Sequence, residues 1–452
     1  MTIKITGPIH GGTHGWPYAA AIVDLADQGY IEEEYFFEAA APSYRPVGDF
    51  GIDGRWTAER AGETVFKTRA VVRRPRDPAR FNGTVIVEWN NVSAGSEIFE
   101  GGDTAVIFDE GFAYVGVSAQ RVGVHGFDAY PQGLRAWDPE RYESLHIQDD
   151  SLSYGIFTRV AQAFATGRPR APIDPLDGLD VRTLLAIGGS QSASRLVTYI
   201  NAVQPVERVF GGFVAFTWFG SGSSLDDPSP IDLNAGGLAA LARYPTQIRD
   251  DLDVPAIVVN SECETLSCAP VRQPDTDRFR FWEVAGAPHG PRLHMERIAG
   301  KMKRDGASLP GEFDWDSLGP VPWAPVLDAA IGHLQAWSNG GQPPPSQPLI
   351  ELEGEPLRIR RDADGNACGG VRVPEQQVTL SRNIGAFEEP GAAGLMGSWS
   401  PLAAEVLRAR YRDQTEFVSQ FESAARAAVA AGVLRPRDAA DSIERAKERA
   451  LP

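Results

Sequence analysis

Short apolar runs alternate along the chain with segments whose apolar residues recur at helical spacing. Runs with the length and residue types of buried strands lie at 83–89, 113–119, 181–187, 209–216, 254–259 and 279–285. Two longer runs, 34–40 and 64–73, come before them and predict an opening antiparallel pair. Helical spacing begins near residues 149, 191 and 326. Strands that alternate with helices in this way predict an α/β fold with a mostly parallel, doubly wound sheet.

Two long segments between these elements carry neither strand nor helix periodicity. Residues 121–148 are rich in glycine, proline, tyrosine and tryptophan, and residues 217–253 contain two glycine-rich stretches. Long irregular segments inside an alternating strand and helix pattern are more often functional than incidental. We therefore expect both segments to form lids or pocket walls.

The last quarter of the chain has a different pattern. Residues 340–348 are rich in proline and glycine, as linkers are, and residues 402–451 have helical composition and periodicity. We expect a core domain over residues 1–338. A linker and a mainly helical extension that packs on this core should occupy residues 339–452.

The most informative stretch is the junction between the apolar run 181–187 and the helical segment that follows it. Ser190 lies at this junction, so a strand must give way to a helix within about two residues. Such a corner strains the backbone, and the small neighbours Gly188 and Ser192 relieve the crowding. The arrangement is that of a nucleophile elbow, which exposes the serine hydroxyl above the sheet at a helix N-terminus. We predict that Ser190 is a catalytic nucleophile.

A nucleophilic serine needs a general base within reach of its hydroxyl. His289 directly follows the predicted strand 279–285, which should run parallel to the strand before Ser190. Parallel strands bring the loops after their carboxyl ends to one edge of a sheet, where ligands bind in open α/β folds. We predict His289 as the base, with His294 as the alternative.

The base in turn needs a carboxylate that holds its tautomer and stabilises the imidazolium. Glu262 and Glu264 both follow the predicted strand 254–259, in the chain order expected of an elbow enzyme. We prefer Glu264 as the acid, because its place further along the turn gives its carboxylate room to reach His289. Glu262 remains the alternative.

An oxyanion hole should complete the site. Its donors would be the backbone N–H of Gln191, the residue after the nucleophile, and one from the loop after strand 83–89. That loop offers the amides of Asn91 and Val92, between which the sequence does not decide. Aromatic side chains in the two irregular segments are expected to form an apolar pocket above the serine. The pocket candidates are Trp218, Phe219, Tyr130 and Trp137.

Composition and charge narrow the classes of partner. The 452 residues are 42% apolar and 23% charged, an ordinary globular balance, and the net charge is −17. This charge disfavours nucleic acid and anionic membranes as partners. Three cysteines build no disulfide framework, and no cysteine and histidine cluster suggests a zinc site, so we expect no bound metal. The chain begins without an apolar signal segment and has no membrane-spanning run, which predicts a cytoplasmic protein.

Three motifs together resemble the bacterial "alpha/beta hydrolase domain" family of serine hydrolases. They are the run IGGSQSASRLVTYINAVQP, the pair VPAIVVNSECET and RQPDTDRFRFWEVAGAPH, and the late run DGNACGGVRVP. In this resemblance, the serine of the SQS triplet matches Ser190 and the histidine that closes the WEVAG run matches His289. The resemblance implies an alpha/beta-hydrolase fold and hydrolysis of carboxylic esters without a cofactor. Glu264 stands where the resemblance leads us to expect aspartate.

The residues and the resemblance converge on one activity. We expect a serine carboxylesterase that forms an acyl-enzyme on Ser190 and acts on a small apolar or aromatic ester. Lactonase, thioesterase and acyltransferase activities use the same chemistry, and a slow-turnover small-molecule binding protein is a further alternative. A dinucleotide site is disfavoured, because the glycines are adjacent and not spaced G-x-G-x-x-G.

Overall fold

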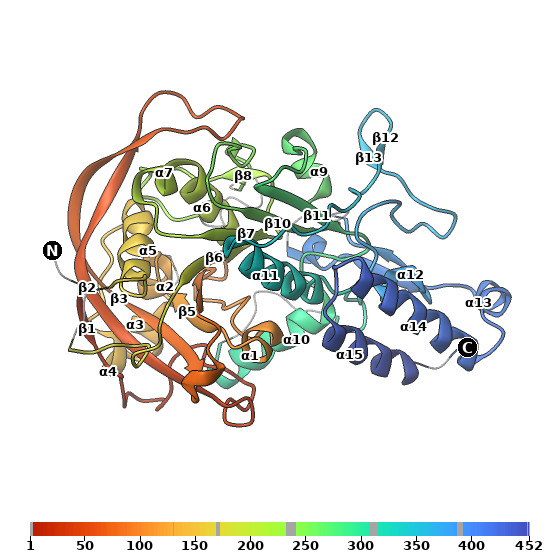
Figure 1. The fold of residues 1–452 in the computed structure, drawn as a ribbon, viewed down its shortest axis with the longest axis horizontal. Helices are drawn as coiled ribbons and strands as arrows, with labels where there is room; N and C mark the ends of the chain where they lie inside the picture. The colour runs from red at the N-terminus through yellow and green to blue at the C-terminus, as the bar shows by residue number, and fades with distance from the viewer. Residues whose placement is uncertain are drawn as a thin grey trace.

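The computed structural model describes residues 3–129, 131–168, 172–231, 241–307, 314–386, 392–449 and 451. Within these ranges the central sheet has nine strands (Figure 1). From one edge to the other they are β1 (Lys4–Thr6), β2 (Tyr30–Pro46), β3 (Ala58–Pro75), β5 (Ala113–Val117), β4 (Thr84–Trp89), β6 (Thr183–Gly189), β7 (Gly212–Phe216), β10 (Ala256–Ser261) and β11 (Phe279–Val284). The first four pair antiparallel, and all pairings from β5 to β11 are parallel. The expected α/β class with a mostly parallel sheet is confirmed.

The strand β6 lies in the middle of the parallel part and is buried on both faces. Its Leu184 and Ala186 belong to one hydrophobic cluster, while Leu185 and Ile187 belong to a second cluster on the other face. This explains why the run is continuously apolar instead of alternating. Leu185 pairs with Ile86 of β4, which sets the register of the strand before Ser190.

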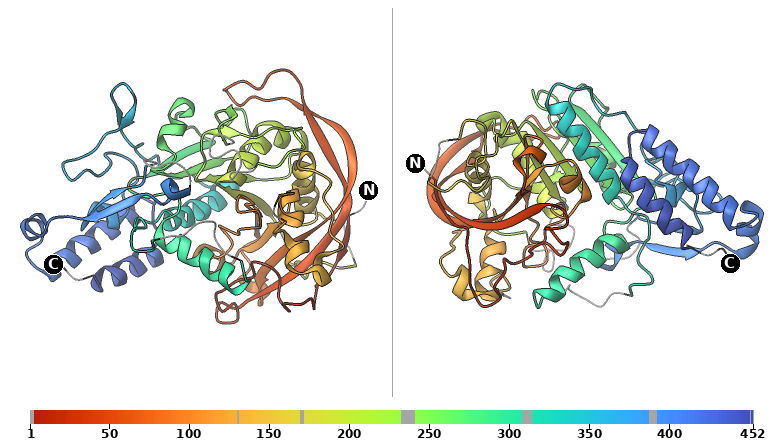
Figure 2. Two further views of the ribbon diagram at one scale, coloured as in Figure 1. Left: turned by 180° about the vertical axis from the view of Figure 1, so that it is seen from behind. Right: turned by 60° about the horizontal axis from the view of Figure 1, so that its bottom comes forward.

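Helices cover both faces of the sheet (Figure 2). On one face lie α5 (Ser153–Gln162) and α6 (Gln191–Thr198), which contact β2 and β6. On the other face α11 (Ala324–Ser338) contacts β7 and β10, and the short α1 (Ala105–Asp109) packs on α11. The chain continues beyond α6 through a π-helical turn into α7 (Gln204–Glu207). The helix α10 (Arg292–Arg304) follows the His289 loop.

The first two long strands extend well beyond the predicted runs 34–40 and 64–73. β2 and β3 pair over almost their whole length and curve around one end of the molecule (Figure 1). The first half of β3 is largely exposed, from Glu59 to Val65. A search for apolar runs misses such a ribbon, because its outer part pairs through the backbone without burying side chains.

The two predicted lid segments contain short elements. Residues 121–148 hold α2 (Arg121–His125), α3 (Leu134–Trp137) and α4 (Pro139–Tyr142), which are too short to produce a periodic signal. Residues 217–253 hold the two-residue strands β8 (Ser221–Gly222) and β9 (Tyr244–Pro245), and α9 (Thr265–Cys268) follows β10. Among the described helices, none is long and apolar enough to cross a bilayer.

The C-terminal extension packs on the core at the β11 end of the sheet. Val371 forms backbone hydrogen bonds with Glu283 and Ala285, so the extension covers the β11 edge. Ala425 and Ala428 share a cluster with Ile331 of α11. In its described residues, the extension contains two antiparallel strand pairs besides its helices. Its elements are β12 (Leu352–Glu353), β13 (Arg358–Ile359), α12 (Pro374–Gln377), β14 (Ser381–Ile384), β15 (Ser398–Pro401), α13 (Ala404–Arg410), α14 (Gln414–Ala430) and α15 (Pro436–Lys447).

Candidate active site

Ser190 occupies the tight corner between β6 and α6. Its backbone has φ 55° and ψ −119°, a conformation that non-glycine residues adopt rarely and at a cost. The Ser190 amide is held by the carbonyl of Phe216 at 3.0 Å and by the hydroxyl of Thr217 at 3.1 Å. A Cβ atom at Gly188 would stand 3.0 Å from the carbonyl oxygen of Ser192, so this close approach favours a glycine. The corner therefore has the geometry of a nucleophile elbow.

His289 and Glu264 meet at the same edge of the sheet. They follow β11 and β10, and the Nδ1 atom of His289 lies 2.7 Å from Oε1 of Glu264. The second oxygen of this carboxylate accepts hydrogen bonds from the amide (2.8 Å) and hydroxyl (2.7 Å) of Ser261. Glu264 is fully buried, whereas the His289 side chain is 12% exposed. With Nδ1–H donated to the carboxylate, Nε2 of His289 is free to accept a proton.

Glu262 faces a different set of partners. Its carboxylate accepts hydrogen bonds from the amides of Gly286 (2.7 Å), Gly385 (3.2 Å) and Ala386 (3.2 Å), and forms an ion pair with Arg361 at 2.7 Å. These partners belong to the loop that leads to His289 and to the C-terminal extension. Of the two candidate acids, Glu264 is the one in contact with the imidazole.

The backbone amides near Ser190 differ in whether they already donate a hydrogen bond within the protein. The Asn91 amide donates to the carbonyl of Ile98 at 3.2 Å, and the Asn90 amide donates to that of Val117 at 3.3 Å. The Val92 amide has no hydrogen-bond partner among the described residues. Gln191 is the first residue of α6, where an amide has no partner within the helix. The Asn91 side chain reaches the elbow instead, with Nδ2 at 3.3 Å from the carbonyl oxygen of Gly189.

Only one of the described aromatic pocket candidates lies against the His289 ring. Phe219 stacks on it, with ring centroids 5.2 Å apart. Trp218 is buried in the core and donates its indole N–H to the carbonyl of Ser221. Trp137 stacks on His14 and donates to the carbonyl of Asp305, so its contacts are with the N-terminal segment and the end of α10. Tyr130 lies outside the described residues.

The structure also brings Glu100 and Trp323 to the site, two residues that the sequence did not single out. Glu100 accepts a hydrogen bond from Nδ2 of Asn91 at 2.6 Å, and Trp323 donates its indole N–H to the carbonyl of His289 at 2.9 Å. His294, the alternative base, is buried against Trp323, and burial lowers its pKa well below the usual value. No motif connects these residues, because they come from three separate segments that only the fold brings together.

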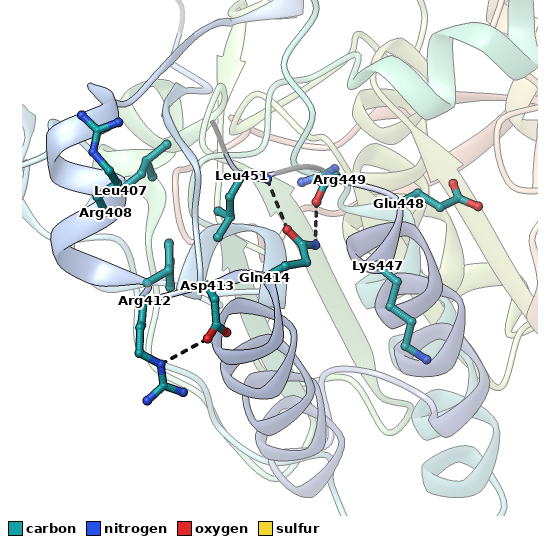
Figure 3. A pocket seen from close by; sticks show the side chains of 10 residues that line it. Leu407, Arg408, Arg412, Asp413, Gln414, Lys447, Glu448, Arg449 and Leu451 are labelled. Carbon is teal, nitrogen blue, oxygen red and sulfur yellow. Dashed lines mark hydrogen bonds and ion pairs between the residues drawn. The ribbon is translucent and has the colours of Figure 1, made fainter.

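A surface hollow lies in the extension, away from Ser190, and the described residues offer no metal site. In the described ranges, no group of three or more histidine, cysteine, aspartate or glutamate side chains is placed to hold a metal ion. A hollow of about 640 Å³ lies in the extension between α13, the start of α14 and the end of α15 (Figure 3). There Gln414 donates to the carbonyl of Arg449 and accepts from the amide of Leu451. This hollow is at the opposite end of the molecule from β2 and β3 (Figure 1).

Comparison with protein families finds one match over nearly the whole chain. The model of the family described as "Alpha/beta hydrolase domain" matches residues 5–444. A comparison with curated proteins finds no match. Among solved structures, the esterase Est22 is 14% identical, with a TM-score of 0.35, over 62% of this chain and 78% of Est22. A glucuronoyl esterase from Solibacter usitatus is 9% identical, with a TM-score of 0.29, over 62% of this chain and 80% of its own.

Proposed function

We propose an activity for this chain, which belongs to the alpha/beta hydrolase domain family. It is a serine hydrolase and cleaves carboxylic esters through an acyl-enzyme on Ser190. The observation that carries the proposal is the 2.7 Å contact between His289 and Glu264 at the sheet edge of Ser190. All three residues follow the carboxyl ends of parallel strands of one sheet. A strained serine together with a carboxylate-bound imidazole is the arrangement that acyl transfer requires.

In the proposed reaction, Nε2 of His289 takes the proton of the Ser190 hydroxyl as the oxygen attacks the ester carbonyl. Glu264 holds the imidazole by Nδ1 and stabilises the imidazolium. The tetrahedral intermediate collapses when His289 gives its proton to the departing alcohol. Water, deprotonated by the same imidazole, then cleaves the acyl-enzyme and releases the acid.

The negative oxygen of the tetrahedral intermediate needs fixed donors. We assign them to the backbone amides of Gln191 and Val92. The helix start leaves the first amide without an intrahelical partner, and the second makes no hydrogen bond among the described residues. Asn91 is less suited, since its amide is engaged with Ile98.

The wall beside His289 supports a proposal for the substrate class. Phe219 stacks on the imidazole and packs with Leu241 and Cys263, so this side of the site is apolar. We propose a small ester with an apolar or aromatic group that lies against Phe219.

Labelling with a fluorophosphonate probe tests the nucleophile, because such probes react covalently with an activated serine. The wild type should be labelled and should turn over short p-nitrophenyl esters many times, whereas Ser190→Ala should do neither. Equal labelling of wild type and Ser190→Ala would show that the nucleophile is another residue. Labelling of Ser190 with a single turnover would favour a binding protein over an esterase.

A further inference from the structure

The residue after Ser190 has a buried side chain that a second glutamine holds. Nε2 of Gln191 donates to Oε1 of Gln120 at 2.8 Å, and Nε2 of Gln120 donates back to Oε1 of Gln191 at 3.2 Å. Gln191 is fully buried, and Gln120 is 1% exposed. Two hydrogen bonds between planar amides fix the distance between the side chains as well as their relative orientation. The start of α6 is therefore fastened to Gln120, which lies directly before α2.

A second contact fastens α2 to α6. The amide of Arg121, the first residue of α2, donates to Oδ1 of Asp150 at 2.8 Å. Oδ2 of the same carboxylate accepts a hydrogen bond from Arg195 of α6 at 3.0 Å. Asp150 thus supplies the acceptor at the start of α2, while the Gln120 side chain makes no cap hydrogen bond and pairs with Gln191 instead. The position of α2 against α6 is fixed at two points.

The same short helix packs on the loop after β4, which contains the second proposed oxyanion donor. Val92 of this loop forms a buried cluster with Val122 of α2 and with Phe127. A Cβ atom at Gly123 of α2 would come within 2.5 Å of Oε1 of Glu97, so the helix backbone lies directly against this loop. One helix of the first irregular segment is therefore joined to both proposed donor residues.

The two donor residues follow different strands, Val92 after β4 and Gln191 after β6. Two amides that receive one oxygen must keep a fixed spacing, so the loops that carry them need support. We infer that Gln120 is a positioning residue of the oxyanion hole, which together with α2 holds the backbone amides of Gln191 and Val92 in place. The inference rests on the proposed function and gives the first irregular segment, residues 121–148, a part in the reaction. Gln120 contacts no substrate atom in this role and acts through Gln191.

Such support affects the charged intermediate more than the bound ester. Donors that are held in place before the reaction stabilise the negative oxygen without reorganising, and they add little to the binding of the uncharged ester. Loss of Gln120 should therefore lower kcat and kcat/KM by the same factor. It should also weaken inhibition by trifluoroacetone. In that adduct the Ser190 oxygen bonds to the ketone carbon, the Ser190 proton passes to His289, and the ketone oxygen becomes the negative oxygen in the hole.

The first variant is Gln120→Met, which keeps the length of the side chain and removes both hydrogen bonds. We expect kcat and kcat/KM for p-nitrophenyl acetate to fall about tenfold to hundredfold, and the inhibition constant of trifluoroacetone to rise by a similar factor. Wild-type values of kcat and of the inhibition constant in this variant would overturn the inference.

A second variant separates positioning from stability. Gln120→Met leaves the side-chain amide of Gln191 buried without a partner, which destabilises the fold. The double variant Gln120→Met with Gln191→Met has no such amide, so it should regain most of the lost urea midpoint. Its kcat should stay low, because two thioether side chains pack without the directional hydrogen bonds that fix the start of α6 in the wild type. A kcat that returns to the wild-type value together with the urea midpoint would mean that the pair is purely structural, and would contradict the inference.

Gln204→Met is the matched control. The buried Gln204 also makes two amide hydrogen bonds, donating to the carbonyl of Phe210 at 2.8 Å and accepting from its amide at 3.3 Å. Phe210 precedes β7, so this pair lies at the amino end of the strand, away from Ser190. We expect Gln204→Met to lower the urea midpoint while kcat and the inhibition constant keep their wild-type values. A fall of kcat as large as that of Gln120→Met would show that any lost buried amide contact lowers activity, and would refute the role of Gln120.

Failure of the proposed function has a different signature. If the fluorophosphonate does not label Ser190 in the wild type, or labels Ser190→Ala equally, the site assignment is wrong and the inference is wrong with it. If Ser190 is labelled and Gln120→Met has the wild-type kcat, only the role of Gln120 is wrong.

Discussion

At the scale of single residues, the conformation of Ser190 leads to a prediction about stability. A positive φ costs a residue with a Cβ atom roughly 1–3 kcal/mol, and glycine avoids most of this cost. We expect Ser190→Gly to have a free energy of unfolding about 1 kcal/mol higher than Ser190→Ala, as measured by urea denaturation. An alanine variant as stable as the glycine variant would mean that the elbow carries no backbone strain.

Ser194, one turn further along α6, supplies the control for this comparison. Ser194 is buried within the helix and is not among the residues with a positive φ, and glycine in a helix interior is less favourable than alanine by about 1 kcal/mol. Ser194→Gly should therefore be less stable than Ser194→Ala, the opposite order to that at Ser190. The reversal separates backbone strain from a general effect of glycine on α6.

The sequence located some site residues better than others, and the reason is topological. Ser190, Glu264 and His289 each directly follow an apolar strand, so the rule about strand ends predicts from the sequence alone that they share one edge of the sheet. Their catalytic roles stay predictions. Glu100 follows no strand, and its proximity to Gly189 depends on how an irregular loop folds back, which no periodicity encodes.

At the scale of elements, the strands of the parallel sheet were the easiest to predict. Buried strands such as β6 and β10 are apolar on both faces over most of their length, so the apolar run in the sequence locates them to within two residues at each end. The first half of β3, from Glu59 to Val65, is largely exposed, so it contains few apolar residues from which a strand could be predicted. The hairpin β12–β13 consists of two-residue strands, too short for any pattern to develop.

The loops that carry Glu264 and His289 are connected by Glu262. Its buried carboxylate joins the Gly286 amide of the His289 loop to Gly385 and Arg361 of the extension. Glu262→Gln removes the negative charge that pairs with Arg361. It also replaces one carboxylate oxygen by an NH₂ group, which cannot accept a hydrogen bond from a backbone amide. We expect kcat for p-nitrophenyl acetate to fall about tenfold or more, with a loss of about 2 kcal/mol in the free energy of unfolding.

Glu351→Gln is the control for this prediction. Glu351 belongs to the same extension and pairs with Arg360, but its side chain is 47% exposed. Exposed ion pairs contribute little, so this variant should stay within about 0.5 kcal/mol of the wild type and keep its kcat. Equal kcat values for Glu262→Gln and wild type would show that the extension does not hold the catalytic loops.

At the scale of the whole molecule, the extension is attached to the core through both apolar and charged contacts. Ala425 and Ala428 pack with α11, while Arg435 at the start of α15 forms ion pairs with Asp328 of α11 (3.4 Å) and Asp109 of α1 (3.1 Å). The sequence predicted that the extension packs on the core but not where. The place where the extension attaches depends on ion pairs such as those of Arg435 with Asp328 and Asp109. These residues are far apart in the sequence, and nothing in the sequence pattern indicates that they pair.

This attachment makes stability depend on pH through Asp328. Burial raises the pKa of Asp328 from 3.8 to about 7, the charge of Arg435 opposes the rise, and one carboxylate oxygen has no hydrogen-bond partner. Between these pH values the folded state binds more protons than the unfolded state, so stability falls as the pH rises. Asparagine cannot ionise. Asp328→Asn should therefore be more stable than the wild type by a few kcal/mol at pH 8. The gain should be on the order of 1.4 kcal/mol for each pH unit that separates the folded and unfolded pKa values of Asp328. At pH 4 the variant should show no such gain.

Urea denaturation at pH 4, 6 and 8 measures this difference. The exposed Asp441 on α15 serves as the control, and its substitution by asparagine should change stability little at each pH. A gain for Asp328→Asn that is equal at pH 4 and pH 8 would mean that packing and not charge is responsible. A loss at pH 8 would mean that the ion pair with Arg435 outweighs the cost of burying the carboxylate, and that the extension is held to α11 mainly by charge.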